Sequence, residues 1–520
     1  MRETNQARVC VPVCVRRADE LRASVTRAAE LADVVELRLD CLDADQLAPA
    51  RGLLGALLGE TRPPFIITYR PREQGGGRDV SLGERADFWR ELPEALRDVG
   101  GRERDFVDLE LDLLESPHAA SLGELFERFR VICSHHDFRG TPAGLEELFG
   151  RMARTPAEIL KVATKANSVT DCVEVLRLCE RGRREGRECI AVSMGEAGFM
   201  TRVLAPAFGA FLTYASLDAS QATAPGQITA RELREVYRVG EINPRTLVTG
   251  LVGSPVGHSL SPHMHNAAFA ATGLDAVYLP FEVTDLPGFM RRMADPRTRE
   301  LGWNLRGFSV TAPHKQAVIP HLDRVAENAS RVGAVNTVVV TEGRGLEGFN
   351  TDAAASVFPL EGLVELRGAS VAVIGAGGAA RALLCALGEG GASATVFARD
   401  PARAREVAEA FGVEWGTLEG ARFGRFEVIV NATPLGTRGS REAETPALTE
   451  QLRGVRVAYD LVYNPAETRF LREARAAGCR TVGGLGMLVA QAEEQSRLWT
   501  GREPPPGVML AAAEKKLSGQ

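Results

Sequence analysis

The chain has little of what a membrane protein, a nucleic-acid-binding protein or a disulfide-stabilised protein needs. No apolar run in its 520 residues approaches the roughly 20 residues of a membrane-spanning helix. The formal net charge of −6 leaves no basic excess for nucleic acid. The nine cysteines are scattered without a Cys-x-x-Cys pair, so we expect free thiols rather than a disulfide framework or a zinc site. The first residues show no secretory or transit-peptide pattern, and together these absences predict a cytoplasmic location.

The first 240 residues alternate short β-rich runs with amphipathic helical stretches. A chain of 520 residues is too long for one hydrophobic core, so we expect several domains. Eight β/α units in the first part predict a closed (β/α)₈ TIM barrel, and an open doubly wound sheet, which usually has fewer strands, is the alternative. The eight β-rich runs begin at Val9, Val34, Phe65, Phe106, Val131, Glu158, Glu188 and Phe211.

A different organisation begins after residues 240–246, where an Asn-Pro pair breaks the pattern. Residues 247–355 are typical of a mixed α/β domain, which we expect to bind a substrate. A strand, a glycine-rich turn and a helix follow from Val371, and further strand-like runs predict a Rossmann domain over 356–485. We expect the final helices, 486–518, to complete the middle domain.

Several polar side chains interrupt the apolar runs of the predicted barrel. Barrel enzymes carry their catalytic groups at the C-terminal ends of the strands. Glu36 and Arg38 are two residues apart and therefore share one face of their strand. Lys161 lies inside another apolar strand, and His136 lies at the end of a third. Further polar candidates follow the last two strands: Arg202, Thr223 and Gln227.

A lysine inside a barrel strand is costly unless it is paired or neutral. Burial and neighbouring cations would lower its pKa and provide a nucleophilic amine near neutral pH. Such an amine condenses with a ketone to an iminium, which acidifies the adjacent C–H for an elimination, while a histidine moves the protons. The pattern predicts metal-free Schiff-base chemistry at Lys161, and an ion pair between Lys161 and Glu36 is the purely structural alternative.

The motifs ELRLD, TYRPREQGG, SHHDF, ILKVAT, SMG and APGQ occur here in the order found in type I 3-dehydroquinate dehydratase, which the chain resembles over about residues 8–238. The resemblance implies that Lys161 forms an imine with the ketone of 3-dehydroquinate. It implies that His136 takes the proton and assists loss of the hydroxyl as water, and that Arg202 binds the substrate carboxylate. The remaining substrate contacts that it implies are Glu36, Arg38, Arg70, Thr223 and Gln227.

Two positions depart from that family pattern. Gln74 stands where a loop carboxylate is usual, with Glu73 one position earlier, so neither residue is assigned an acid–base role. Thr223 replaces the usual serine and keeps the hydroxyl. A Schiff-base aldolase is an alternative enzyme, which His136 and the APGQ loop disfavour.

The segment GAGGAA follows a strand and opens a helix, the context that supports dinucleotide binding. Its backbone can approach a pyrophosphate at the helix N-terminus. At the end of the next strand, Arg399 and Arg403 offer cations for a 2′-phosphate, which favours NADP. Asp400 could accept a ribose hydroxyl and leaves NAD open. The residues of the turn that would contact the cofactor are Gly375, Ala376, Gly377, Gly378 and Ala379.

Polar motifs between the barrel and this turn provide a second site. Lys315 and Asp352 form a candidate pair that could donate a proton as hydride reduces a ketone, with a surface ion pair as the alternative. Ser259 and Ser261 flank a tight loop and could bind a carboxylate. A metal site at His258, His263 and His265 is disfavoured because no acidic or cysteine partner stands at ligand spacing.

These segments, with YDLVYNP and GLGMLVAQ, resemble shikimate dehydrogenase over about residues 247–510. The resemblance implies that Lys315 and Asp352 are catalytic, although Ser309 replaces the usual asparagine and is expected to loosen one contact. Ser259, Ser261 and Tyr463 would hold the carboxylate, and Thr311, Asn336, Asp352 and Gln491 the ring hydroxyls. Asn431, Thr433, Gly484 and Met487 would approach the nicotinamide.

The order of the two halves resembles the bifunctional dehydratase–dehydrogenase enzymes of the shikimate pathway, which supplies chorismate and the aromatic amino acids. The resemblance implies small-molecule substrates, namely 3-dehydroquinate, 3-dehydroshikimate and shikimate, and NADPH as the cofactor. Oxidation of quinate is an alternative for the second half, and retention of both serines favours shikimate. A non-catalytic metabolite sensor is another alternative, but it should have lost Lys161, Lys315 or Asp352.

Overall fold

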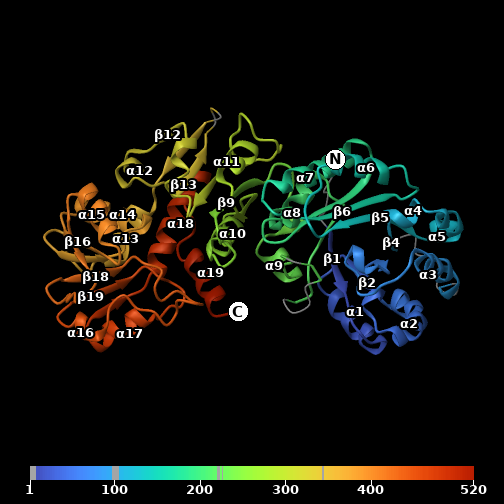
Figure 1. The fold of residues 1–520 in the computed structure, drawn as a ribbon, viewed down its shortest axis with the longest axis horizontal. Coiled ribbons are helices and arrows are strands. Elements are labelled where there is room, and N and C mark those ends of the chain that lie inside the picture. The colour runs from blue at the N-terminus through green and yellow to red at the C-terminus, as the bar shows by residue number, and fades with distance from the viewer. Residues whose placement is uncertain are drawn as a thin grey trace. The chain divides into compact units, whose positions relative to one another are not determined.

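The structure is a computed structural model that describes residues 8–96, 105–218, 223–224, 226–341, 343 and 345–519 (Figure 1). The chain forms two compact units. The first contains Met1–Leu247, Leu279–Ala294 and Thr298–Asn304, and the second contains Val248–Tyr278, Asp295–Arg297 and Leu305–Gln520.

The eight expected strands of the first unit form one parallel sheet in the order β7-β6-β5-β4-β3-β2-β1-β8. A parallel bridge between Cys189 and Ala210 brings β7 to the start of β8, which confirms the predicted barrel. The strands are β1 (Arg8–Val13), β2 (Val34–Arg38), β3 (Phe65–Thr68), β4 (Phe106–Glu110), β5 (Arg130–Asp137), β6 (Ile159–Lys165), β7 (Glu188–Met194) and β8 (Leu212–Tyr214).

The helices between these strands are amphipathic, as their burial shows. In α6, the buried residues Leu145, Phe149 and Met152 recur at helical spacing and face the barrel wall. The N-terminus of α3 is fixed by a capping box between Ser81 and Glu84. The α-helices of this part are α1 (Leu21–Ala29), α2 (Leu47–Glu60), α3 (Leu82–Ala95), α4 (Leu111–Leu114), α5 (Gly123–Arg128), α6 (Leu145–Met152), α7 (Asp171–Arg184), α8 (Phe199–Leu204) and α9 (Ala230–Glu235).

An apolar layer inside the barrel determines which residues lie above it. Val34, Phe106, Ile159 and Leu212 belong to one buried cluster with apolar residues of the other strands. Side chains alternate along a strand, so residues two positions further on point to the same interior. The next layer toward the C-terminal ends of these four strands therefore consists of Glu36, Asp108, Lys161 and Tyr214.

A second sheet contains six strands in the order β10-β9-β11-β13-β14-β12 and mixes parallel and antiparallel pairs. It is the mixed α/β sheet that the sequence predicts after residue 247. Its strands are β9 (Leu247–Gly253), β10 (Ala276–Glu282), β11 (Gly307–Val310), β12 (Arg324–Val325), β13 (Thr337–Val340) and β14 (Leu346–Phe349). Its helices are α10 (Ser261–Ala271), α11 (Leu286–Phe289), α12 (Glu327–Val332) and α13 (Asp352–Val357).

The third sheet is parallel and has the order β17-β16-β15-β18-β19-β20 of the predicted Rossmann fold. Val371 and Val373 of β15 pack in one apolar cluster, and the alternate residues Ala372 and Ile374 pack in another, so both faces are covered. Its strands are β15 (Ser370–Ile374), β16 (Ser393–Ala398), β17 (Glu414–Thr417), β18 (Val428–Asn431), β19 (Val457–Asp460) and β20 (Arg480–Val482). Its helices are α14 (Gly378–Glu389), α15 (Pro401–Phe411), α16 (Thr449–Leu452) and α17 (Arg469–Ala476).

The last two helices, α18 (Leu485–Thr500) and α19 (Val508–Leu517), pack against α10. Met264 and Ala268 of α10 share a buried cluster with Ala492 of α18 and Met509 of α19. The C-terminal helices therefore return to the residues that follow β9. Among the described residues, none of the helices combines the length and the apolar character that spanning a bilayer requires.

Cys14 and Cys41 form a disulfide, so the expectation of free thiols throughout is wrong for this pair. Cys14 directly follows β1, and Cys41 ends the short 3₁₀ helix (Leu39–Cys41) after β2. The two strands are parallel neighbours, which brings these turns together although they are 27 residues apart in sequence. The other seven cysteines are free and buried.

Candidate active sites

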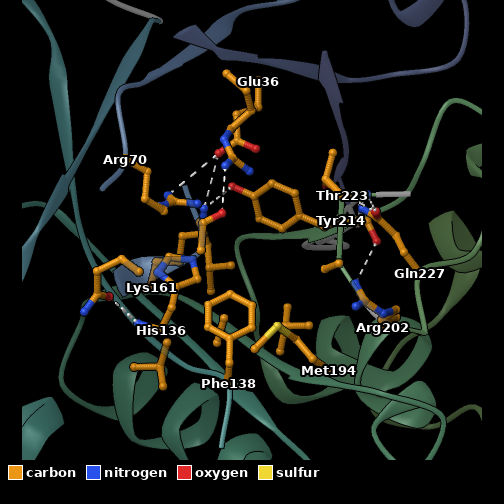
Figure 2. A pocket seen from close by; sticks show the side chains of 18 residues that line it. Glu36, Arg70, His136, Phe138, Lys161, Met194, Arg202, Tyr214, Thr223 and Gln227 are labelled. Atoms are coloured by element: carbon orange, nitrogen blue, oxygen red, sulfur yellow. Dashed lines mark hydrogen bonds and ion pairs between the residues drawn. The ribbon is translucent and has the colours of Figure 1, made fainter. Parts of the chain in front are cut away.

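The barrel carries a cavity that is open to solvent at the C-terminal ends of its strands. In Figure 2, Glu36, Arg70 and Lys161 meet in one part of the cavity, and Arg202, Thr223 and Gln227 gather in another. All eight residues predicted for the dehydratase site line this cavity, and so does Gln74: the eight are Glu36, Arg38, Arg70, His136, Lys161, Arg202, Thr223 and Gln227.

Lys161 is buried, and three groups surround its amine. Its Nζ lies 2.7 Å from Oδ2 of Asp108, 2.8 Å from the hydroxyl of Tyr214 and 3.4 Å from Oε1 of Glu36. The sequence led us to expect cations beside this amine, but the charges that it contacts are carboxylates. The ion pair with Glu36 that we considered as an alternative is present, and it lies inside the cavity.

Arg70 belongs to the same buried charge network. Its Nη2 donates to Asp108 at 2.6 Å, and its Nε lies 3.6 Å from Oε1 of Glu110. Burial alone would raise the pKa of Asp108, but the charges of Arg70 and Lys161 outweigh burial and hold that pKa well below its usual range. Burial dominates at Glu110 and raises its pKa to about 7, partly offset by Arg70.

His136 is buried beside this network, and its ring lies parallel to that of Phe138 with 6.3 Å between centroids. Burial, and then the charges of Arg70 and Lys161, lower the pKa of the His136 imidazole well below 6.5. The ring is therefore neutral near pH 7 and able to take a proton, as a general base requires.

Gln74 takes part in the site by fixing the backbone of β5. Its Oε1 accepts a hydrogen bond of 2.8 Å from the backbone N–H of His136. Nearby, Arg38 donates twice to Asp40, at 2.9 and 2.7 Å, and once to the carbonyl oxygen of Gly75 at 3.1 Å. An amide oxygen thus occupies the position at which the family has a carboxylate, and it acts as an acceptor.

The other part of the cavity carries groups suited to a carboxylate and to hydroxyls. Arg202 is buried, and burial lowers its pKa to about 10, so the guanidinium remains charged at neutral pH. The side-chain oxygen of Gln227 accepts hydrogen bonds from the backbone N–H and the hydroxyl of Thr223, at 2.7 and 3.2 Å. Pro225 of the same motif lies outside the described residues.

The sequence analysis missed three residues of the site: Asp108 and Glu110, which are buried in the charge network of Arg70, and Tyr214, which lines the cavity. The first two alternate in FVDLEL as Glu36 and Arg38 do in VVELRLD, so the same rule would have found them. Tyr214 is two residues beyond the buried Leu212, but an aromatic residue does not interrupt an apolar pattern. No sequence signal therefore distinguished it from a core residue.

In the second unit, Lys315 and Asp352 form a partly buried ion pair with 2.5 Å between Nζ and Oδ2. Asn336 lies next to this pair, because its side chain donates to Thr351 at 3.0 Å and accepts from the backbone N–H of that residue at 2.8 Å. A Cβ added to Gly378 would lie 3.3 Å from Cδ of Lys315, so the lysine reaches the glycine-rich turn. The surface ion pair considered as an alternative is thus not what the chain forms.

The glycine-rich turn fits a dinucleotide. Gly375 has φ of +128°, and a Cβ there would lie 2.7 Å from the carbonyl oxygen of Ala432. Gly377 caps α14 without a side-chain hydrogen bond, and a Cβ there would meet nothing within 4 Å. Open space before the unsatisfied N–H groups of a 12-residue helix is suited to a pyrophosphate. Ala376 and Ala379 lie in the same turn and the first turn of α14.

The carboxylate of Asp400 is used within the protein. It caps α15 by accepting from the backbone N–H of Ala402 at 3.0 Å. Arg399 and Arg403 are exposed, and within the described part of the chain the side chain of neither makes a hydrogen bond or an ion pair. The two arginines are therefore available for a phosphate, while the acidic residue is engaged by its helix.

The residues assigned to the shikimate carboxylate gather near the start of α10. The Ser259 hydroxyl accepts from the backbone N–H of Ser261 at 3.2 Å. Leu260, between the two serines, belongs to the apolar cluster against which Tyr463 packs.

Two of the residues assigned to the ring hydroxyls are Gln491 and Thr311. Gln491 of α18 is buried and donates to the carbonyl oxygen of Leu488 at 2.8 Å. Thr311 follows β11 and lies against Gly253 at the end of β9.

Ser309 does not leave a loose contact inside the protein. Its hydroxyl accepts from Tyr278 at 2.8 Å and donates to Oε1 of Gln495 at 2.8 Å. Gln495 in turn donates to the hydroxyl of Thr337 at 3.1 Å. Ser309, which departs from the family pattern, is therefore part of a continuous chain of buried hydrogen bonds next to Asn336.

The residues assigned to the nicotinamide lie at the C-terminal ends of the Rossmann strands. Asn431 ends β18, and its side chain donates to Asp460 at 2.9 Å and accepts from Thr433 at 2.6 Å. Gly484 caps α18, and a Cβ there would lie 2.3 Å from the carbonyl oxygen of Leu461. Met487 is buried in the Rossmann core.

No group of three or more potential metal ligands occurs among the residues that the structure describes. His265, one of the three histidines considered for a metal, is buried and lies parallel to Tyr278 with 4.2 Å between ring centroids. Burial lowers its pKa to about 3. Its role in this structure is therefore that of an aromatic core residue.

Comparison with known proteins gives a consistent result for both halves. The family model of type I 3-dehydroquinase matches residues 9–244. The models of the shikimate dehydrogenase substrate binding domain and of the shikimate 5'-dehydrogenase C-terminal domain match residues 251–338 and 484–514.

The relatives described here match either the dehydrogenase half of the chain or nearly all of it. The NADP(+) shikimate dehydrogenase of Thermococcus kodakarensis is 43% identical over 52% of this chain and 98% of its own length. A solved shikimate 5-dehydrogenase from Thermus thermophilus, in complex with NADP(H) and shikimate, is 42% identical, covers 52% of this chain and 99% of its own, and has a TM-score of 0.46. The chloroplastic bifunctional 3-dehydroquinate dehydratase/shikimate dehydrogenase of Arabidopsis thaliana is 34% identical over 96% of this chain and 83% of its own length. The chain therefore belongs to the family of bifunctional 3-dehydroquinate dehydratase/shikimate dehydrogenases.

Proposed function

We propose that the chain catalyses two consecutive steps of the shikimate pathway. The barrel dehydrates 3-dehydroquinate to 3-dehydroshikimate, and the second half reduces this product to shikimate with NADPH. The observation that carries the proposal is the buried amine of Lys161, which lines a cavity together with the neutral imidazole of His136.

The dehydration follows from these two groups. The Lys161 amine attacks the ketone carbon, and the carbonyl oxygen leaves as water to give an iminium. His136 removes a proton from the carbon next to the iminium, the electron pair forms the new double bond, and the β-hydroxyl departs as water with the proton that His136 returns. Hydrolysis of the imine consumes one water and frees the lysine, so the net reaction is loss of one water.

The remaining cavity residues hold the substrate in this proposal. Arg202 binds the carboxylate, as a buried guanidinium does well. Thr223 and Gln227 bind hydroxyl groups near it. Glu36, Arg38 and Arg70 line the other part of the cavity, where Arg70 and Lys161 share Asp108.

In the dehydrogenase half, Lys315 is placed to protonate the ketone oxygen as it becomes a hydroxyl, and Asp352 holds the lysine. Bound NADPH supplies the hydride. Ser259, Ser261 and Tyr463 bind the carboxylate, while Thr311, Asn336, Asp352 and Gln491 bind ring hydroxyls. The glycine-rich turn, Arg399 and Arg403 hold the phosphates, and Asn431, Thr433, Gly484 and Met487 border the nicotinamide.

The proposal assigns three functional domains to the chain. Residues 1–240 form the dehydratase barrel, residues 247–355 with the helices of 486–518 form the substrate domain of the dehydrogenase, and residues 356–485 form its NADP domain. The packing of α18 and α19 against α10 supports this division.

A cytoplasmic location is also part of the proposal. Seven buried free thiols are typical of a protein made in a reducing compartment, whereas the bond between Cys14 and Cys41 argues the other way. Fractionation of cells that express the chain tests the location, and recovery from an oxidising compartment would contradict it.

A coupled assay tests the two activities: 3-dehydroquinate and NADPH are supplied, and shikimate is measured. We expect Lys161→Met to lower dehydration by roughly a thousandfold or more while shikimate oxidation with NADP continues. Asp352→Asn should lower the dehydrogenase kcat by roughly a hundredfold or more and spare dehydration.

The chain offers a control for the lysine, because Lys165 lies on the same strand with its side chain exposed. Lys165→Met should leave both activities unchanged. Borohydride with 3-dehydroquinate should label Lys161, which peptide mapping resolves easily since the chain has five lysines: Lys161, Lys165, Lys315, Lys515 and Lys516. Labelling elsewhere, or loss of both activities in one folded variant, would refute the two-site proposal.

A further inference from the structure

Tyr214 of β8 lies directly against the reacting amine of the barrel. Its hydroxyl is 2.8 Å from Nζ of Lys161, and Nζ is 4.4 Å from the centroid of its ring. Figure 2 shows the ring reaching into the cavity between Arg202 and the cluster of Arg70 and Lys161. The side chain thus presents both an oxygen and an aromatic face to the same nitrogen.

The phenol differs from the other acceptors around Nζ because it is neutral. Burial, and then the charge of Glu36, raise the pKa of the Tyr214 hydroxyl, so it remains protonated at neutral pH. Asp108 and Glu36 are carboxylates, and Oδ2 of Asp108 also accepts from Arg70 at 2.6 Å. Tyr214 is therefore an acceptor that does not compete for a proton.

This difference matters after the imine forms. The free ammonium group has three N–H bonds, but an iminium nitrogen keeps only one. The elimination needs that proton to stay on nitrogen, because a neutral imine withdraws electrons less strongly from the neighbouring C–H. A carboxylate as the partner of this N–H can remove the proton, whereas a neutral hydroxyl accepts the hydrogen bond and leaves the charge in place. The ring face adds attraction for the cation.

We propose that Tyr214 is a further catalytic residue of the dehydratase, whose hydroxyl accepts the hydrogen bond of the Lys161 iminium N–H while its ring faces the cation. The side chain thereby keeps the imine protonated while the proton on the adjacent carbon is removed. The inference rests on the proposed imine at Lys161 and adds to it the group that stabilises the charged form of that imine.

Two substitutions separate the hydroxyl from the ring. Tyr214→Phe removes only the acceptor, and we expect kcat for dehydration to fall about ten- to a hundredfold, as for loss of a hydrogen bond to a charged group. KM should change little, because the contact is made to the enzyme's own nitrogen. Tyr214→Leu also removes the ring and should lower kcat further.

A pH profile distinguishes this role from a purely structural one. Loss of the acceptor makes the iminium a stronger acid, so the alkaline limb of kcat should move to lower pH in Tyr214→Phe. The other titratable or charged groups around this nitrogen are Asp108, Glu36, His136, Arg70 and Cys10, and all of them are unchanged in the variant. The dehydrogenase activity of the same chain and its unfolding curve show whether the protein is intact.

Tyr237→Phe is the matched control, because it removes the hydroxyl of a buried tyrosine that packs on Phe199 outside the cavity lining. This control should keep the wild-type kcat and pH profile. If wild-type Lys161 is labelled by borohydride but Tyr214→Phe retains kcat and the alkaline limb, or raises only KM, the role of Tyr214 is refuted while the dehydratase stands. If Lys161 is not labelled in the wild-type protein, the proposed function itself fails.

Discussion

At the scale of single residues, two exposed arginines, Arg399 and Arg403, follow the second strand of the Rossmann sheet, with Asp400 between them in the sequence. Asp400 caps α15, which leaves Arg399 and Arg403 as the groups free to meet a ribose phosphate. We therefore expect specificity for the phosphorylated cofactor to depend on the positive charges of Arg399 and Arg403, and this can be tested without disturbing the substrate site.

The double substitution Arg399→Ala, Arg403→Ala should raise KM for NADPH by about ten- to a hundredfold, because charged hydrogen bonds to the 2′-phosphate are lost. KM for NADH should hardly change. Arg405→Ala on the same helix is the control, since Arg405 is exposed and pairs with Glu409. Steady-state kinetics with both cofactors decides the matter, and an unaltered KM for NADPH would exclude these arginines from the phosphate site.

His265 makes the stability of the dehydrogenase half depend on pH. Its pKa is about 3 in the folded protein because of burial, against 6.5 for an exposed histidine. The unfolded chain therefore binds the extra proton first, so this contribution to stability is intact above pH 6.5 and declines as the pH falls toward 3.

We expect wild type to lose roughly 1.5 kcal/mol of unfolding free energy through His265 between pH 6.5 and 5. His265→Phe keeps an aromatic ring against Tyr278 and should remove this part of the loss. Urea unfolding followed by tryptophan fluorescence at both pH values measures it, with His321→Asn as the control at a less buried histidine. Equal losses in wild type and His265→Phe would contradict the expectation.

A charged residue that interrupts an apolar strand is a sequence signal for a site, whereas an aromatic residue that preserves the apolar pattern is not. Glu36, Arg38 and Lys161 interrupt apolar strands, and the structure places all three on the cavity. Tyr214 preserves the apolar pattern, so only its distance from Lys161 reveals it. The ion pair between Lys161 and Glu36 was considered from the sequence, but the contact between Lys161 and Asp108 was not, because the pairing of side chains across a barrel depends on the register of its strands.

At the scale of elements, all eight predicted barrel strands are present, because short β-branched runs at regular spacing are a strong signal. The disulfide between Cys14 and Cys41, in the turns after β1 and β2, could not be predicted from the cysteine pattern. It requires knowledge that these strands are neighbours and that their C-terminal ends are level, which only the folded sheet provides.

The disulfide between these turns should stabilise the barrel by about 3–4 kcal/mol, as expected for closing a loop of this length in the unfolded chain. Dithiothreitol should therefore lower the denaturant midpoint for loss of dehydratase activity. Cys14→Ser, Cys41→Ser should unfold like the reduced wild type and be insensitive to the reductant, since the remaining cysteines are buried free thiols. Identical midpoints for oxidised and reduced wild type would show that the bond contributes nothing.

At the scale of the whole molecule, the two chemistries lie in different compact units and use different side chains. In the proposed mechanisms, the barrel uses one buried lysine and a neutral imidazole, whereas the dehydrogenase uses a Lys–Asp pair beside a glycine-rich turn. Because no catalytic residue is shared, a substitution that disables one reaction should leave the other working.

Covalent fusion of the two units also fixes their stoichiometry. Every translated copy delivers one lyase centre and one reductase centre, so gene expression raises or lowers both by the same factor. The balance between supply and consumption of the intermediate must therefore be set by the turnover numbers and by the NADPH pool, and not by the relative abundance of two enzymes.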